Sequence, residues 1–371
     1  MKPASANEIS VAPFSVHSDL GMLLPLYLCE RAAERAMVLA TLIDTRGSTY
    51  RKPGAQLLLA DNGVYAGLLS GGCLEGDLCE HAQGVRTSNT ARIVEYNLNH
   101  PDDTLFGLDA GCAGSLRILL QPISAHNQWQ PLAYLAHCWQ QYRYQPIALM
   151  THSEDPQWPL GTVIFAAGEA ITPQGIRHSM PWSVTTALSH PAQRGGLQPL
   201  SAATQAFVLH TVLPPKLLIL GAGDDAQLLA ANAHLLGWQI TVIDHRAALI
   251  SAERFTQAHR ICLRPEQLNA QSLDDYAAAV IMSHQLTADA HYLRALAHTH
   301  IPYIGLLGPA ARRQRLFDEL GEQMALLWPR LHAPVGLDLG AATPPAIALS
   351  IIAQIQQTLS TPPFVKAENH H

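Results

Sequence analysis

Apolar positions in the first half of the chain recur with helical and strand-like periods. Leu20, Leu23, Leu24, Tyr27 and Leu28 have helical spacing, so a helix is predicted over residues 15–35. Shorter apolar runs predict strands, two of which form a hairpin around Asp61-Asn62-Gly63. The expected strands are 37–43, 56–60, 64–68, 91–96, 115–121, 146–152, 161–166 and 207–212, with further helices over 74–87 and 130–142.

The second half alternates apolar runs with amphipathic segments. Buried strands are predicted at 216–220, 239–243, 277–283 and 302–308, with helices that end at Leu236, span 287–298 and begin at Ala310. Thr343 is expected to cap a final helix that has Pro344 at its first position and reaches Leu359. This alternation is typical of an α/β domain with a parallel sheet.

The pattern weakens over residues 172–206, which are rich in Pro, Gly, Ser and Gln. We interpret this stretch as a mixed segment ending in an inter-domain linker, and Pro214-Pro215 as a boundary signal. The expected organisation is an N-terminal mixed α/β domain with its linker over residues 1–206, followed by a C-terminal Rossmann-like domain over residues 207–371.

Composition narrows the class of protein. With 371 residues, 48% of them hydrophobic and 14% charged, the chain is globular and long enough for two domains. A net charge of -6 without a basic block argues against a nucleic-acid partner. Six irregularly spaced cysteines favour free thiols in a reducing compartment. Without a secretory pattern or a membrane-length apolar run, the expected location is the cytoplasm, with no membrane contact.

The stretch Ser70-Gly71-Gly72-Cys73 lies between a predicted strand and a predicted helix. Two glycines let the backbone take positive φ, and a helix start offers N–H groups to an anion. A thiol at this place is expected to ionise easily and to serve as a nucleophile or soft-metal ligand, although Glu75 and Asp77 oppose the thiolate. The alternative is that Cys73 is a buried small residue in a tight turn.

Two further loops of the first domain are candidates for ligand contacts. The loop at 45–54 holds three cations and three Ser or Thr hydroxyls, among them Ser48, Arg51 and Lys52, and is either an anion-binding loop or a solvated surface loop. A second Gly-Cys turn contains Cys112. The two Gly-Cys turns either converge on one ligand or are unrelated, and their spacing does not decide between these alternatives.

The second domain contains a dinucleotide fingerprint, Gly221-Ala222-Gly223-Asp224-Asp225-Ala226. In this motif Gly221 makes a tight turn and Gly223 lets a pyrophosphate approach, while an acid about 20 residues later accepts hydrogen bonds from a ribose. Asp244 is that acid. However, Asp224 and Asp225 place negative charge where the pyrophosphate would sit. Arg246 either offsets this charge, holds a phosphate or lies on the surface.

His284 and Gly308 follow predicted parallel strands, at the edge where such sheets bind ligands. The alternative for His284 is a strand-end histidine whose hydrogen bonds are satisfied. Arg312 and Arg313 either meet phosphates or form a solvated helix face.

These motifs together resemble the XdhC/CoxI accessory proteins of molybdenum hydroxylases such as xanthine dehydrogenase. The resemblance covers about residues 20–125 and 214–357. In the first domain it rests on Gly47-Ser48-Thr49, Arg51-Lys52-Pro53-Gly54, Ser70-Gly71-Gly72-Cys73-Leu74-Glu75 and Gly111-Cys112-Ala113-Gly114. In the second it rests on Gly221-Ala222-Gly223, Val242-Ile243-Asp244-His245-Arg246, Ser283-His284, Asp289, the segments 303–308 and 333–340, and Thr343-Pro344. Asp224 departs from the family, which commonly has histidine there.

The resemblance implies an accessory protein rather than an enzyme. Such a factor binds molybdenum cofactor, as molybdopterin or its cytosine dinucleotide, while a cysteine desulfurase exchanges an oxo ligand for sulfur. It then inserts the cofactor into a xanthine or aldehyde dehydrogenase-type molybdenum hydroxylase, and homodimer formation is compatible with this role. The expected cofactor contacts are Ser48, Arg51, Lys52, Ser70, Gly71, Gly72, Cys73, Glu75, Cys112, Gly221, Gly223, Asp244, His284 and Gly308, with Cys73 and Cys112 at the metal.

Two other functions stay open at this point. One is an NAD(P)-dependent oxidoreductase that uses His284 as acid or base, although Asp224 and Asp225 count against it. The other is a non-catalytic adaptor that binds a hydroxylase and a desulfurase but no small molecule. A Rossmann-like fold alone does not choose among these functions.

Overall fold

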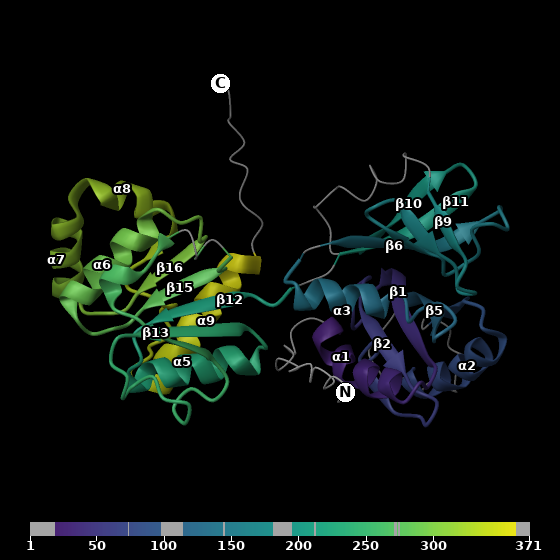
Figure 1. Ribbon diagram of the computed structural model, residues 1–371, viewed down its shortest axis with the longest axis horizontal. Helices are drawn as coiled ribbons and strands as arrows, with labels where there is room; N and C mark the ends of the chain where they lie inside the picture. The colour runs from purple at the N-terminus through teal and green to yellow at the C-terminus, as the bar shows by residue number, and fades with distance from the viewer. Residues whose placement is uncertain are drawn as a thin grey trace, which may run out of the picture. The chain divides into compact units, whose positions relative to one another are not determined.

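The computed structural model describes residues 19–72, 74–97, 114–143, 145–180, 195–210, 213–270, 273 and 275–360. The chain divides into two compact units between Leu213 and Pro214 (Figure 1). This division falls later than the boundary expected after residue 206. The reason is that β11 (Thr204–His210) pairs with β6 (Pro146–Ser153) and so belongs to the first unit.

The first unit contains a five-stranded antiparallel sheet in the order β3-β2-β1-β5-β4. Its strands are β1 (Met37–Gly47), β2 (Gln56–Leu59), β3 (Tyr65–Gly67), β4 (Arg92–Asn97) and β5 (Gly114–Ile123). Helix α2 (Glu75–Ser88) packs Leu78 and Ala82 against alternate residues of β1, such as Val38 and Ala40. Helix α1 (Asp19–Ala32) packs beside β2 and β3.

A second antiparallel sheet in this unit has the order β10-β11-β6-β7-β8-β9. Besides β6 and β11 it contains β7 (Val163–Phe165), β8 (Glu169–Ile171), β9 (Arg177–Ser179) and β10 (Gly195–Ser201), and helix α3 (Leu132–Gln140) precedes it. The prediction of a linker within 172–206 is therefore wrong for its described residues. The sequence hides β10 because an edge strand tolerates Pro199 and needs no regular apolar alternation.

The second unit is built on a six-stranded parallel sheet in the order β14-β13-β12-β15-β16-β17. The strands are β12 (Lys216–Leu220), β13 (Gln239–Asp244), β14 (His259–Cys262), β15 (Ala278–Ile281), β16 (Tyr303–Leu306) and β17 (Leu331–His332). Counted along the chain this is the order 3-2-1-4-5-6 of the Rossmann fold. The predicted Rossmann-like domain is confirmed, although the short edge strands β14 and β17 were not predicted.

Helices cover both faces of the parallel sheet (Figure 1). Helices α5 (Asp224–Leu235) and α9 (Pro344–Ser360) share one apolar core. Helices α6 (Leu286–Ala297), α7 (Ala310–Leu320) and α8 (Met324–Leu327) share the other. Short 3₁₀ turns lie at Pro265–Gln267, Gly321–Gln323 and Trp328–Arg330. Among the described residues, no helix combines the length and apolar character that crossing a membrane requires.

Gly67 ends β3 at a place where a side chain has no room. Its φ is +97°, and a Cβ there would lie 2.3 Å from the carbonyl oxygen of Gln56. We expect Gly67→Ala to lower the free energy of unfolding by about 2–4 kcal/mol, because strain and overpacking add. Urea denaturation measures this loss.

Gly63→Ala is the matched control in the same hairpin. Its φ is +78°, but no atom lies within 4 Å of the added Cβ, so only the backbone strain applies. The expected loss is about 1–2 kcal/mol. An equal loss for both variants would show that the close approach at Gly67 does not matter.

Candidate functional site

Three strand ends of the first unit lie at the same end of its five-stranded sheet. Gly47 at the end of β1 pairs with Gly114 at the start of β5. Leu57 near the start of β2 pairs with Gly67 at the end of β3. Because these neighbours are antiparallel, the ends of β1 and β3 and the start of β5 all lie at the same end of the sheet.

The loop after β1 contacts both of the other segments. A Cβ at Gly114 would lie 2.4 Å from the carbonyl oxygen of Arg46 and 3.1 Å from Cγ2 of Thr49. A Cβ at Gly71 would lie 3.9 Å from the ring of Tyr50. Gly71 and Gly114, which belong to the two Gly-Cys turns, thus flank one loop. The spacing of these turns in the sequence did not decide whether they lie near each other.

The Glu75 carboxylate organises the glycine turn between β3 and α2. Its Oε1 accepts hydrogen bonds from the backbone N–H groups of Leu69 (3.1 Å) and Ser70 (3.0 Å). Its Oε2 accepts from the N–H groups of Gly72 (3.0 Å) and Leu74 (3.2 Å) and from the Ser70 hydroxyl (2.5 Å). These groups surround the carboxylate as they would surround a bound anion.

The environment of Glu75 favours its charged form. The residue is only 2% exposed, and burial works to raise the pKa of the carboxyl. Hydrogen bonds from Ser70 and Leu69 outweigh burial and hold this pKa below its usual range. Glu75 is thus an internal anion, and the four N–H groups that it binds are not open to an external phosphate as the sequence had indicated.

The cations of the loop after β1 differ in how they are held. Nη2 of Arg51 donates to both carboxylate oxygens of Asp19, at 2.5 and 2.7 Å, and so fixes the loop to α1. Arg46, Ser48 and Lys52 are exposed, and neither Arg46 nor Lys52 forms an ion pair with any residue that the structure describes. Sequence reasoning did not select Arg46, whose place beside Gly114 depends on strand register.

The expected metal ligands Cys73 and Cys112 lie outside the described residues. In the described part of the chain, no three His, Cys, Asp or Glu side chains come together as a metal site.

The crevice of the Rossmann domain lies between the carboxyl ends of β12 and β15. Gly221 has φ of +119°, and a Cβ there would lie 2.6 Å from the carbonyl oxygen of Met282, so the turn packs tightly against β15. A Cβ at Gly223 would lie 2.7 Å from Oδ1 of Asp225 and 3.8 Å from Cδ2 of His284. Nε2 of His284 is hydrogen-bonded to Oδ2 of Asp225 at 2.8 Å.

Asp244 at the end of β13 is almost fully buried, with 1% exposure. Its Oδ2 accepts from the N–H of Ala222 (2.8 Å) and Nη2 of Arg246 (2.7 Å). Its Oδ1 accepts from the N–H (2.8 Å) and Nε (2.9 Å) of Arg246. Although burial works to raise the pKa of Asp244, these hydrogen bonds lower it below its usual range. In this structure, Asp244 is held by groups of the protein itself.

Asp289 forms a second buried carboxylate in the crevice. It accepts hydrogen bonds from the Ser283 hydroxyl and from Nη2 of Arg312. Burial raises the pKa of its carboxyl, and these partners oppose that rise. Gly308 lies beside Arg312, and its carbonyl oxygen accepts from Nη1 of Arg313 at 2.7 Å. Arg312 and Arg313 therefore bind groups of the protein itself. The sequence had indicated only a phosphate contact or a solvated helix face for them.

Four carboxylates of the crevice each have an arginine or histidine partner. Arg254 completes the set, because its Nη2 donates to Asp224 at 2.8 Å and to the carbonyl oxygen of Ala222 at 3.2 Å. The pairs are Asp224–Arg254, Asp225–His284, Asp244–Arg246 and Asp289–Arg312.

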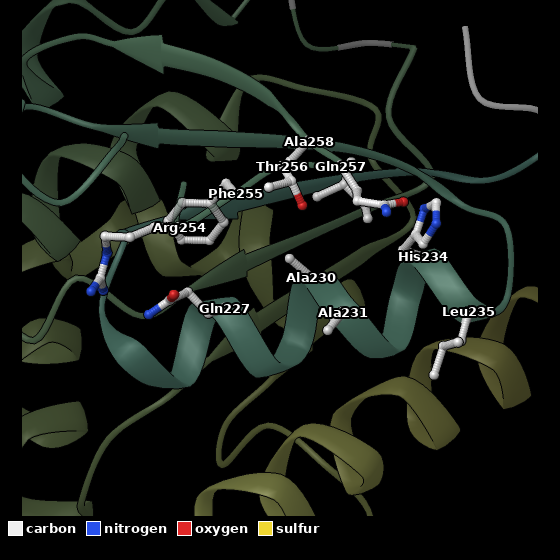
Figure 2. Close-up of a pocket in the computed structure, with 11 residues that line it drawn as sticks. Gln227, Ala230, Ala231, His234, Leu235, Arg254, Phe255, Thr256, Gln257 and Ala258 are labelled. Carbon is white, nitrogen blue, oxygen red and sulfur yellow. The ribbon is translucent and has the colours of Figure 1, made fainter. Parts of the chain in front are cut away.

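A cavity of about 320 Å³ lies along α5, and Arg254 of the Asp224–Arg254 pair is among its lining residues. Figure 2 shows Gln227, Ala230 and His234 of α5 facing the segment that carries Phe255 and Gln257. None of the residues selected from the sequence line this cavity.

Two family models match this chain. The model of the XdhC and CoxI family matches residues 30–97, and that of the XdhC Rossmann domain matches residues 217–355. The chain belongs to the XdhC and CoxI family. The matched ranges include the Glu75 turn of the first unit and the Rossmann crevice of the second.

Relatives of this XdhC/CoxI-family chain match it along most of its length. It is 28% identical over 323 residues to a probable xanthine dehydrogenase subunit of Bacillus subtilis, covering 86% of this chain and 92% of the relative. It is 24% identical over 326 residues to the molybdenum cofactor insertion chaperone PaoD of Escherichia coli, covering 86% and 83%. A crystal structure described as a xanthine dehydrogenase from Bacillus halodurans has a TM-score of 0.72 and 27% identity, covering 92% of this chain and 96% of that one.

The hydrogen bonds to Glu75 predict a pH-dependent contribution to stability. We expect Glu75→Gln to lower the free energy of unfolding at neutral pH by about 2–3 kcal/mol, because hydrogen bonds to a charged acceptor are lost. Since the folded pKa is lowered, this contribution is present above the unfolded value of about 4.3 and is lost as pH falls through the folded pKa. Urea denaturation at several pH values measures the difference.

Glu80→Gln on the exposed side of α2 is the control and should change stability little at any pH. A Glu75→Gln deficit that persists unchanged at acid pH would contradict the role given to the ionised carboxylate.

Proposed function

We propose that this protein is a cytoplasmic accessory factor that binds molybdenum cofactor in its first unit. It holds the cofactor while a cysteine desulfurase exchanges an oxo ligand for sulfur, and then inserts it into a molybdenum hydroxylase of the xanthine or aldehyde dehydrogenase type. The observation that supports the proposal is that the ends of β1 and β3 and the start of β5 lie at the same end of the sheet, near exposed Arg46, Ser48 and Lys52. Family membership and similarity to an insertion chaperone support it.

The chemistry of the loops suits this cargo. Molybdenum cofactor carries a phosphate or pyrophosphate and a soft metal bound through a dithiolene. Arginine and lysine donate charged hydrogen bonds to phosphate oxygens, which fits Arg46 and Lys52. Thiolates are the side chains that a soft metal prefers, which fits Cys73 and Cys112.

The hydrogen bonds of the turn assign different roles to its polar residues. Glu75 and Arg51 bind protein groups, so we propose that they position the loops rather than touch the cofactor. The exposed backbone of Gly71 and Gly72 leaves the turn accessible from solvent. The proposed contacts are Arg46, Ser48, Lys52, Gly71, Gly72, Cys73 and Cys112.

Titration of the full chain with molybdenum cofactor tests the proposal. We expect Cys73→Ala to weaken binding by about tenfold or more, because a metal-facing thiolate is lost. Activation of an apo-hydroxylase should fall in parallel. Cys262→Ala, which removes an exposed thiol from the second unit, is the control and should bind as the unaltered chain does.

Two outcomes would contradict this function. Unchanged binding and unchanged activation by Cys73→Ala would remove the thiol from the site. Absence of cofactor binding by the unaltered chain would favour the adaptor, which contacts the hydroxylase and desulfurase without a small molecule.

A further inference from the structure

We infer that the Rossmann crevice of this chain is closed to NAD(P) in the mode that its fingerprint implies. The carboxylate of Asp225, hydrogen-bonded to His284, occupies the place of the pyrophosphate, and the Asp244 carboxylate is engaged by Arg246. Asp225 is thus the specificity-determining residue that excludes this ligand, while Asp244 offers no ribose contact that would compensate. The inference concerns the second unit and stands independently of cofactor binding by the first.

Asp225 fills the place of the pyrophosphate. In dinucleotide-binding domains the pyrophosphate approaches the second glycine and the free N–H groups of the following helix. Here Oδ1 of Asp225 would lie 2.7 Å from a Cβ on Gly223 and accepts the N–H of Ala226 at 2.9 Å. An incoming pyrophosphate would therefore meet a negative charge that already uses a helix N–H group.

His284 holds Asp225 in that position. Its backbone has φ of +59°, and its ring lies over Gly223 while bonded to the carboxylate. The side chains of Asp225 and His284 thus occupy the space beside Gly223 that the absence of a Cβ leaves free.

Asp244 is unavailable to a ribose. A carboxylate has about four lone-pair sites for hydrogen bonds. Asp244 uses four of them, one on the N–H of Ala222 and three on Arg246. Arg246 commits two of its five N–H donors, on Nε and Nη2, to Asp244, which holds the guanidinium against that carboxylate. Because NAD and NADP share the pyrophosphate that Asp225 obstructs, the crevice rejects both forms of the nicotinamide nucleotide.

Titration of the full chain with NADH and NADPH, followed by fluorescence, tests this inference. We expect no saturation of the unaltered chain up to about 1 mM of either nucleotide. Asp225→Ala removes the obstructing carboxylate and is expected to bind NADH with a dissociation constant below about 100 µM, at least about tenfold tighter. Asp225→Asn removes only the charge and serves if the alanine variant does not fold.

Asp275→Asn is the matched control at the opposite end of the strands, where Asp275 is paired with Lys216 at the start of β12. It should resemble the unaltered chain. Saturation of the unaltered chain at or below about 1 mM would overturn the inference. Folded Asp225 variants that still fail to bind NADH would also overturn it, because the carboxylate would then not be the excluding group.

Discussion

In each unit, a carboxylate at the start of a helix accepts backbone hydrogen bonds beside a glycine-rich turn. Glu75 is the first residue of α2 and gathers the N–H groups of the turn before it. Asp225 is the second residue of α5 and takes an N–H group of its own first turn. Each carboxylate lies where the helix dipole favours a negative charge, so the chain supplies internally the anion that such turns otherwise take from solvent.

The same device has different consequences in the two units. In the first, Glu75 lies behind the turn, and the exposed faces of Gly71 and Gly72 remain open. The carboxylate therefore shapes the turn without covering it. In the second, Asp225 and His284 lie beside Gly223 itself, so the carboxylate covers the surface that a pyrophosphate needs. The position of the carboxylate relative to the turn therefore decides whether the exposed face of the turn stays open to a ligand, as with Glu75, or is covered, as with Asp225.

The sequence predicted the Rossmann sheet well because its central strands are buried on both faces and read as continuous apolar runs. It predicted β10 poorly because an edge strand needs no such pattern. The fingerprint glycines were recognised, but the commitment of Asp244 to Arg246 depends on side-chain geometry, which residue spacing does not report. Likewise, Arg46 was missed because strand register, and not the loop sequence, brings it beside Gly114.

The four ion pairs of the crevice differ in how readily they can be opened. Asp244 and Asp289 are buried, so turning Arg246 or Arg312 toward a ligand would leave a buried charge without its partner, which is strongly unfavourable. The Asp225–His284 pair is different, since the histidine side chain is 54% exposed and the carboxylate 20%. Water can solvate both groups if they separate, so this pair can open at lower cost. The half-exposed Asp225–His284 pair therefore opens at lower cost than the buried Asp244–Arg246 and Asp289–Arg312 pairs, which keep the base of the crevice fixed.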